Sequence, residues 1–255
     1  MQLPMQLIDA HCHLEHEAFA GDVAEVVKRA RGAGVAKAVC AGGSLSDNEA
    51  ILRLRRQFPG FVEGVVGLAP HFALQEGVGE HAEFIRTHSH EIVGIGEIGL
   101  DQHHFTPEQL PELESAFRAQ LELAEELALP VVVHSRKAER RVFGILGEFP
   151  KAKVMLHCFY QQKLAAEAVG KGWLVSLPTL KSSASQKIAR EAPLSSLAAE
   201  TDAPFLWQED GRPARNECAN VASVYAMVAG QKHARPEEVA AGINAAVCRF
   251  FGFEV

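Results

Sequence analysis

The sequence predicts an α/β fold, a (β/α)8 TIM barrel that forms a single domain over residues 1–255. Eight short β-rich runs recur at intervals of roughly thirty residues, and the segments between them carry apolar residues at helical spacing. No linker rich in proline, glycine or serine divides the chain. Strands that alternate with helices form right-handed βαβ units and a parallel sheet, and eight such units favour a closed barrel over the alternative, a doubly wound open sheet.

The expected strands and helices follow one another along the whole chain. The strands cover residues 7–11, 35–41, 61–68, 92–99, 130–134, 153–159, 173–177 and 197–202. Helical patterns lie at 22–34, 48–58, 111–128 and 141–149, and a last amphipathic helix at 235–253 is expected to complete the outer ring. Gly32 and Gly34 predict the end of the first helix. Thr106 predicts a helix N-cap, with Pro107 in the first helical position and Gln109 completing a capping box.

The composition excludes several classes of protein. Hydrophobic residues make up 47% of the chain, which supports a large buried core and argues against disorder. Twenty-five basic and thirty-two acidic residues give a net charge of −7, so a protein that coats duplex DNA without specificity is disfavoured. We expect no targeting signal and no membrane span. Five cysteines without a CxxC pair are typical of reduced thiols, so the expected location is cytoplasmic.

Side chains that can bind a metal stand at the carboxyl ends of five expected strands. They are His11 and His13 on the first strand, Glu97 on the fourth, His134 on the fifth, His157 on the sixth and Asp202 on the eighth. In a barrel these strand ends converge on one face. Each residue alone has an ordinary structural explanation, such as a hydrogen-bonded histidine or a turn cap. Their common position predicts one metal-binding pocket.

The number of candidate ligands indicates two divalent ions. Four imidazoles and two carboxylates exceed the three protein ligands that a catalytic zinc usually takes. Glu97, in a glycine-lined segment, is the candidate for a carboxylate that bridges the ions. Residues 94–99 also match the dinucleotide-binding pattern G-x-G-x-x-G, but no helix opens directly after them and a carboxylate would repel a pyrophosphate. The ligand types leave the metal open, with Mg, Mn and Zn as candidates.

Two further carboxylates are expected just behind the ligands. Alternation along the first strand places Asp9 on the same face as His11 and His13, with Cys12 on the opposite face. Glu200 has the same relation to Asp202 in the last strand. Both are therefore expected to orient a ligand, and for Glu200 the alternative is a buried, hydrogen-bonded group in the barrel core.

Together these segments resemble, in order, the motifs of the TatD family of metal-dependent hydrolases, within the amidohydrolase-type barrels. The matching segments are IDAHCHLE at 8–15, GEIGLD at 96–101, PVVVHSRKA at 130–138, HCF at 157–159, ETDAPFL at 200–206 and RNECANV at 215–221. The resemblance implies a two-metal enzyme that hydrolyses phosphodiester bonds in DNA, often as a 3′ to 5′ exonuclease. The implied ligand sets are His11, His13 and Asp202 for one metal, His134 and His157 for the other, and Glu97 between them.

The chain departs from the family's motifs at three places near the expected barrel mouth. Glu15 stands where the family usually has aspartate, Ala69 takes the place of a histidine in GLAPH, and HCFYQQ lacks a Ser-Gly pair. None of these differences removes an expected ligand. All three bear on substrate preference.

The expected reaction is attack of a metal-bound hydroxide on phosphorus while a metal engages a nonbridging phosphate oxygen. Glu97 and Asp202 are the expected catalytic residues, and Asp202 would accept the proton of the attacking water. The residues expected to bind substrate are His103, His104, Arg136 and Arg215. The alternative is an amidohydrolase-type enzyme that cleaves a small-molecule amide, lactone or ester. The sequence leaves the oligomeric state open.

Overall fold

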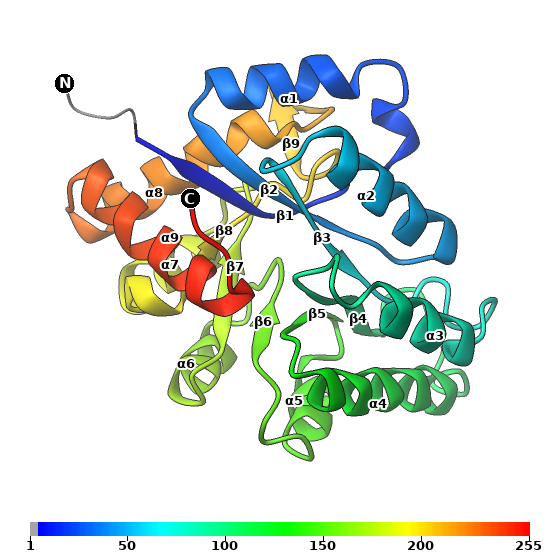
Figure 1. Cartoon of the computed structure of the whole chain (residues 1–255). Helices are drawn as coiled ribbons and strands as arrows, with labels where there is room; N and C mark the ends of the chain where they lie inside the picture. Colours follow the sequence, from blue (N-terminus) through cyan, green and yellow to red (C-terminus); the bar gives the residue numbers. More distant parts are fainter. Residues whose placement is uncertain (1–4) are drawn as a thin grey trace.

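Eight parallel strands pair in sequence order from β1 to β8, and with the helices between them they confirm the predicted (β/α)8 barrel (Figure 1). The computed structural model describes residues 5–255, so the expected domain over 1–255 begins with four residues that lie outside the described part. The strands are β1 Leu7–Cys12, β2 Val35–Ala41, β3 Val62–Val66, β4 Gly94–Asp101, β5 Val131–Arg136, β6 Val154–Leu156, β7 Leu174–Leu177 and β8 Leu197–Ala199. The helices are α1 Val23–Gly32, α2 Leu45–Gln57, α3 Val78–His88, α4 Leu110–Leu127, α5 Glu139–Leu146, α6 Gln162–Gly170, α7 Ser183–Glu191, α8 Ala222–Lys232 and α9 Pro236–Phe251.

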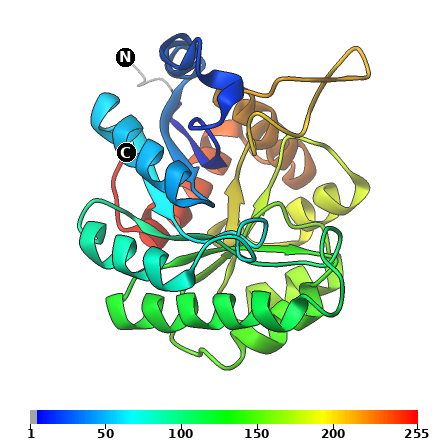
Figure 2. The ribbon, with the colours of Figure 1, turned by 90° about the vertical axis from the view of Figure 1, so that its right-hand side faces the viewer.

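Short elements complete the connections between the main strands and helices. Three 3-10 helices span Glu17–Phe19, Leu194–Ser196 and Cys218–Val221. After β8, the strands β9 Trp207–Glu209 and β10 Arg212–Ala214 form an antiparallel hairpin that projects from the barrel body (Figure 2). None of the helices in the described part of the chain is both long and apolar enough to cross a membrane.

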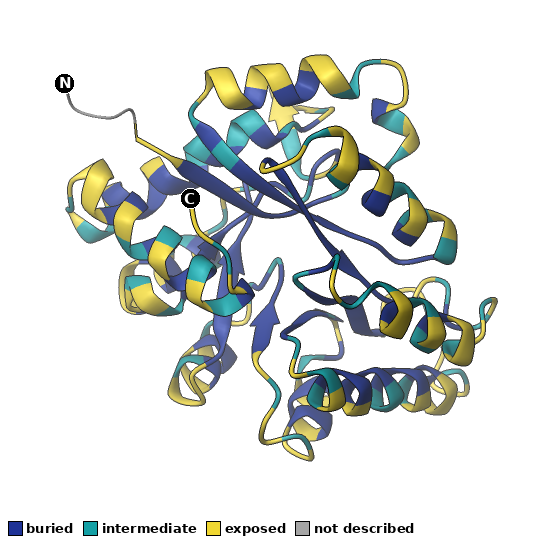
Figure 3. Ribbon diagram, viewed as in Figure 1, coloured by how far each residue is buried: buried dark blue, intermediate teal, exposed yellow. Residues whose placement is uncertain are grey.

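The strands lie at the centre of the molecule and the helices form a ring around them. Every residue of β1, β3, β4, β6, β7 and β8 is buried, whereas the helices bury one face and expose the other (Figure 3). Parallel strands that are covered on both sides in this way are expected to be continuously apolar. The polar side chains that interrupt the apolar runs near the strand ends therefore need partners or ligands.

The barrel closes between β1 and β8. The Asp202 amide donates to the His11 carbonyl at 3.0 Å, and the His13 amide donates to the Ala203 carbonyl at 2.8 Å. Nearer the amino end of β1, the Tyr225 hydroxyl of α8 lies 3.1 Å from both the amide nitrogen and the carbonyl oxygen of Ile8. Helix α9 packs across β1 and β8, as predicted for the last helix.

Two irregularities in strand register lie close to expected ligands. From Asp9 to Cys12, β1 advances three residues while β2 advances two. The strand β4 has the same irregularity around Glu97, where three residues of β4 match two of β5. An extra residue of this kind is a β-bulge, which changes the direction of the side chains near it. His11 and Glu97 therefore do not follow the simple alternation of a regular strand.

The start of α4 differs from the sequence prediction. Gln109 does return its side-chain oxygen to the Thr106 amide, at 2.9 Å, as expected for half of a capping box. Its own amide donates to the Thr106 carbonyl at 3.1 Å, and residues 107–109 form a turn. The helix begins at Leu110, so the predicted start at Pro107 is wrong by one turn.

Candidate metal centre

The six expected metal ligands meet on one face of the barrel, at the carboxyl ends of the strands. His11 lies in β1 and His13 directly after it, Glu97 lies in β4, His134 in β5, His157 directly after β6, and Asp202 after β8. In a (β/α)8 barrel this face carries the active site of essentially every known enzyme. The fold thus brings together residues from five separate segments of the chain.

One group of donor atoms, the first donor set, consists of His11 Nε2, His13 Nε2, Asp202 Oδ1 and Glu97 Oε2. The two ring nitrogens are 3.2 Å apart, and Asp202 Oδ1 lies 3.5 Å from His11 and 3.3 Å from His13. Glu97 Oε2 lies 3.6 Å from His11 and 3.9 Å from His13. Ligands that a tetrahedral zinc holds at 2.0–2.1 Å are separated by about 3.3 Å. The spacing therefore fits a single cation among these four atoms.

The second donor set consists of His134 Nδ1, His157 Nε2 and the other oxygen of Glu97, Oε1. Oε1 lies 2.7 Å from His134 Nδ1 and 3.1 Å from His157 Nε2, and the two ring nitrogens are 3.0 Å apart. Three protein donors leave a position open for water or substrate, which is typical of catalytic sites. Since each oxygen of Glu97 faces a different donor set, the carboxylate has the geometry of a bridge.

Each ligand ring has a second nitrogen that points away from the donor set, here called the outer nitrogen. In three of the rings the outer nitrogen faces oxygen atoms. His13 Nδ1 lies 2.9 Å from the Ala41 carbonyl and 3.1 Å from Glu15, His134 Nε2 lies 3.0 Å from Asp101 Oδ2, and His157 Nδ1 lies 3.7 Å from Glu200 Oε1. For His13 and His134 the acceptor is within hydrogen-bond distance, so it keeps a proton on the outer nitrogen and leaves the inner nitrogen to bind a cation. The donor sets therefore have the chemistry that a divalent cation needs.

Glu200 lies behind two of these rings. Its side chain is fully buried, Oε2 accepts a hydrogen bond from the Ser176 hydroxyl, and Oε1 has no hydrogen-bond partner among residues 5–255. The rings of His11 and His157 stack with centroids 4.1 Å apart, and one nitrogen of each lies within 4.8 Å of a Glu200 oxygen. This buried carboxylate lies behind the two rings and does not line the large cavity.

Asp9 does not share the face of His11, and that expectation is wrong. Its carboxylate accepts hydrogen bonds from the Thr201 amide at 2.9 Å and the Thr201 hydroxyl at 2.6 Å, and it clusters with Cys12 and Cys218. The β-bulge between Asp9 and Cys12 breaks the alternation on which the expectation depended. Through these two hydrogen bonds Asp9 instead positions Thr201, the residue that precedes Asp202.

Protonation equilibria in the cluster are strongly shifted. Burial opposes ionisation of Glu97, but the charge of His157 and hydrogen bonds from the surrounding histidines hold its pKa well below the usual range. Burial also opposes protonation of His13, yet hydrogen bonds to Asp202 and Glu15 raise its pKa well above the usual value. The metal-free cluster therefore retains protons in the positions that a cation would take.

Backbone geometry brings Glu97 and His134 close together. Gly99 has a φ of +132°, and a Cβ atom added there would lie 2.1 Å from the His134 carbonyl oxygen. Only glycine allows β4 and β5 to approach this closely. Asp202 has a φ of +54°, in the left-handed region that residues other than glycine rarely adopt. Such a conformation persists only where surrounding contacts hold it, and it is frequent at functional sites.

A cavity of about 610 Å³ opens above the donor sets. His104 and Arg136, two of the residues expected to bind substrate, line it together with Phe205. His103 is not among the lining residues. Arg215 also lies outside the cavity wall, and its guanidinium donates a hydrogen bond to Asp22 Oδ2 at 2.7 Å. The structure does not support a substrate contact for Arg215.

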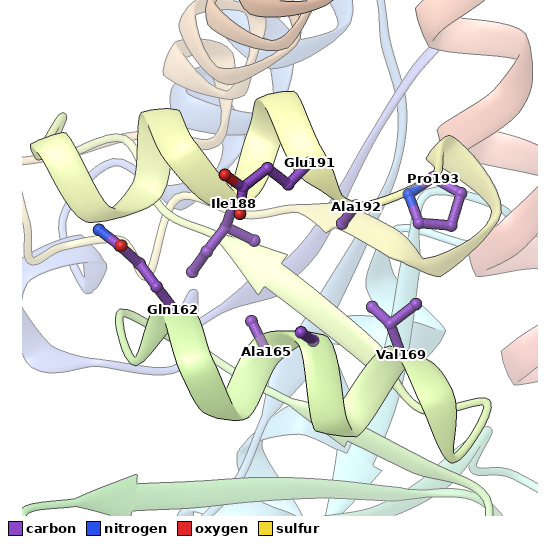
Figure 4. A pocket seen from close by; sticks show the side chains of 8 residues that line it. Gln162, Ala165, Val169, Ile188, Glu191, Ala192 and Pro193 are labelled. Carbon is purple, nitrogen blue, oxygen red and sulfur yellow. The ribbon is translucent and has the colours of Figure 1, made fainter.

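A smaller hollow of about 150 Å³ lies outside the barrel, between α6 and α7 (Figure 4). Its walls are mostly apolar, and the residues that form them are Gln162, Ala165, Ala166, Val169, Ile188, Glu191, Ala192 and Pro193. Glu191 is the one charged side chain among them. The hollow contains none of the expected ligands, so the chemistry of the molecule is concentrated at the barrel mouth.

Sequence reasoning missed two residues of the mouth, Asp101 and His71. Asp101 ends β4, is fully buried, and has its Oδ2 atom 2.8 Å from His104 Nδ1 and 3.4 Å from His71 Nε2. His71 follows β3 and lines the large cavity. The signal that could have found both is their position at or just after the carboxyl end of a strand.

Comparison with known proteins supports this assignment of the fold. The chain matches the family model described as TatD related DNase over residues 8–252. It is 34% identical over 252 residues to an uncharacterized metal-dependent hydrolase of Methanocaldococcus jannaschii, with 97% of each chain covered. It is 36% identical over 221 residues to a protein of Erwinia tasmaniensis named 3′-5′ ssDNA/RNA exonuclease TatD, which covers 81% of this chain and 83% of that one. The solved structure of YJJV, a TatD homolog from Escherichia coli K12, superimposes on this chain with a TM-score of 0.89 and 24% sequence identity. The superposition covers 97% of this chain and 98% of that one, which shows a shared fold.

Proposed function

The chain belongs to the family of TatD-related DNases, and on this premise we propose that it is a two-metal hydrolase that cleaves phosphodiester bonds in DNA. We propose single-stranded DNA as the substrate and digestion from the 3′ end, because a relative that is 36% identical is named 3′-5′ ssDNA/RNA exonuclease. The same name makes RNA the second polymer to test. Since one fold can support many reactions, the site must also favour this chemistry.

Glu97 is the residue on which the proposal mainly depends. Its Oε1 atom lies 2.7 Å from His134 Nδ1, while Oε2 lies 3.6 Å from His11 Nε2 in the other donor set. Two ions bridged by one carboxylate suit in-line displacement at phosphorus, because both the attacking and the leaving oxygen need stabilisation. Imidazole together with carboxylate suits Zn²⁺ or Mn²⁺ better than Mg²⁺, so we propose those ions first.

The remaining residues of the mouth have roles that follow from their positions. Divalent cations held by the two donor sets would polarise a phosphodiester and lower the pKa of water beside it. Asp202 lines the cavity, and it would accept the proton of the attacking water. Arg136 lies in the cavity wall, where a guanidinium can bind a neighbouring phosphate through two hydrogen bonds. An acidic chain needs such local positive charge to hold a polyanion.

The test uses a single-stranded oligonucleotide that carries a fluorophore at its 5′ end, incubated with the purified protein and Mn²⁺, Mg²⁺ or Zn²⁺. We expect a ladder of products that shortens from the 3′ end, and phosphorothioate linkages at that end should suppress it. An RNA of the same sequence and a carboxylic ester, run in parallel, separate the nuclease from the amidohydrolase-type alternative.

Matched variants connect the activity to the site. Glu97→Gln removes the charge of the bridge with little change in shape, and it should lower the rate by roughly 100-fold or more. Glu83→Gln, an exposed glutamate on α3, makes the same chemical change away from the mouth and should leave the rate unaltered. Product formation that is equal in the wild type and Glu97→Gln, or ester cleavage without any nucleotide release, would contradict the proposal.

A further inference from the structure

We propose that the barrel mouth contains a third divalent-cation site, formed by His71, Asp101 and His104, beside the two donor sets that share Glu97. The three residues come from neighbouring segments: His71 follows β3, Asp101 ends β4 and His104 lies in the turn after it. This site goes beyond the proposed function, because a two-metal reaction at Glu97 uses neither His71 nor His104.

The donor atoms already have the spacing of a cation site. Asp101 Oδ2 lies 2.8 Å from His104 Nδ1 and 3.4 Å from His71 Nε2, and all three atoms lie within 4.8 Å of one another. These separations are close to the value of about 3.3 Å expected between ligands of one tetrahedral ion. The rings of His71 and His104 are 5.1 Å apart at their centroids and meet at 63°, so their faces do not stack against each other.

Hydrogen bonding alone does not account for the crowding around Asp101. Three ring nitrogens converge on Oδ2, because His134 Nε2 also lies 3.0 Å away. A carboxylate oxygen has two lone pairs, so it cannot accept from all three rings. The other oxygen, Oδ1, is already engaged by the amides of His103 and His104 at 2.7 and 3.1 Å.

A cation bound beside Asp101 would account for three ring nitrogens around an oxygen that has only two lone pairs. His134 must donate its Nε2 proton to Asp101 if its Nδ1 lone pair is to face the second donor set, and this uses one lone pair of Oδ2. The other lone pair of Oδ2, together with the lone pairs of His71 and His104, would then point at one cation. Asp101 would in this way join the third site to His134 through a single oxygen atom.

The exposure of the three ligand side chains indicates how tightly this ion would bind. The side chains of His71 and His104 are 40% and 45% exposed, whereas Asp101 is fully buried. Two imidazoles and one carboxylate are a donor set that suits Zn²⁺, and three protein ligands leave a position open toward the cavity. With one carboxylate and two partly exposed rings, the third ion should bind more weakly than the ions at Glu97 and should leave first on dialysis.

Crystals of the full chain soaked in Zn²⁺ test the site directly by anomalous diffraction at the zinc edge. We expect an anomalous peak within about 2.0–2.2 Å of His71 Nε2, His104 Nδ1 and Asp101 Oδ2. Absence of density there would overturn the proposal, whatever is seen at the two sets that share Glu97. Peaks at those sets would report separately on the two-metal centre.

The number of Zn²⁺ ions that variants bind per chain in solution gives a second test. The double variant His71→Ala/His104→Ala should bind one Zn²⁺ fewer per chain than the wild type in equilibrium dialysis, and should lack the third peak. His103→Ala, a neighbouring histidine outside the cluster, should bind as many ions as the wild type. Equal zinc counts in the wild type and the double variant would overturn the proposal. If the double variant fails to fold, the anomalous map of the wild type decides alone.

Discussion

The Nε2 atom of His134 lies 3.0 Å from the Oδ2 atom of Asp101, a carboxylate with no exposed surface. Burial opposes ionisation of Asp101, but the surrounding rings of His134, His71 and His104 hold its pKa far below the usual range. Asp101 is therefore an anion under ordinary conditions. Its charge keeps a proton on His134 Nε2, so a cation that replaced the proton shared between Nδ1 and Glu97 Oε1, 2.7 Å away, would meet the Nδ1 lone pair.

Asp101→Asn should weaken metal binding at the second donor set. The amide is nearly the same shape, but it loses the negative charge and can present an N–H group to His134, which then favours the wrong tautomer. Loss of a partner of this kind typically lowers metal affinity by roughly 10- to 100-fold. Competition with a chromogenic zinc chelator measures the change. Asp210→Asn, at an exposed turn, is the matched control and should bind zinc like the wild type; equal affinities in both variants would refute the role of Asp101.

Acidification should release the ions. Burial opposes protonation of His157, but the charge of Glu97 raises the pKa of His157 well above the usual value, and the pKa of His13 is raised as well. A cation needs the neutral rings, so the metal-free protein holds more protons than the loaded one and binding must release them. Affinity should therefore rise with pH, and fall as the pH is lowered.

Titration calorimetry with Zn²⁺ between about pH 6 and pH 8 measures this linkage. Each proton released per ion should change the affinity by about tenfold per pH unit. Repeating the titration in two buffers with different ionisation enthalpies counts the released protons independently. An affinity that does not change with pH would show that the rings are already neutral in the metal-free protein.

Much of the fold and the ligand cluster could be predicted because both follow from the order of strands. A residue at the carboxyl end of a barrel strand lies at the mouth wherever it stands in the chain. This rule brought His134 and Asp202 together although they are far apart in the sequence. It requires only that the strands be identified correctly, and apolar runs between helical patterns are a strong signal.

The residues that were misjudged depend on local geometry that a sequence pattern does not report. Alternation failed for Asp9 because a β-bulge follows it in β1. Arg215 was expected at the substrate, but Asp22, distant in the chain, engages its guanidinium. The position of Asp101 at the end of β4 could have been recognised, but its hydrogen bond to His134 exists only once β4 and β5 are aligned.

Gly99→Ala should strongly destabilise the protein. The new Cβ would meet the His134 carbonyl oxygen at 2.1 Å, and the φ of +132° is unfavourable for alanine, so β4 and β5 must separate. We expect a loss of at least about 3 kcal/mol in the free energy of unfolding. Gly60→Ala is the matched control, since Gly60 also has a positive φ but open space around it, and it should cost about 1–2 kcal/mol. Urea denaturation measures both, and equal losses would mean that the contact with His134 is unimportant.

Tyr225→Phe should destabilise the closure of the barrel without touching the mouth. The hydroxyl lies 3.1 Å from both backbone groups of Ile8 and 2.7 Å from Asn244 Oδ1. Its removal leaves the buried amide of Ile8 without this partner, which typically costs about 1–3 kcal/mol.

Ser223→Ala is the control: it removes a hydroxyl from the same helix that has no hydrogen-bond partner among residues 5–255, so it should cost almost nothing. Urea denaturation of both variants separates a bonded hydroxyl from an unbonded one, and because neither residue is near the donor sets, zinc affinity should be unchanged in both. A Tyr225→Phe protein as stable as Ser223→Ala would mean that the backbone of β1 finds another partner, and that α8 does not hold the barrel closed at this point.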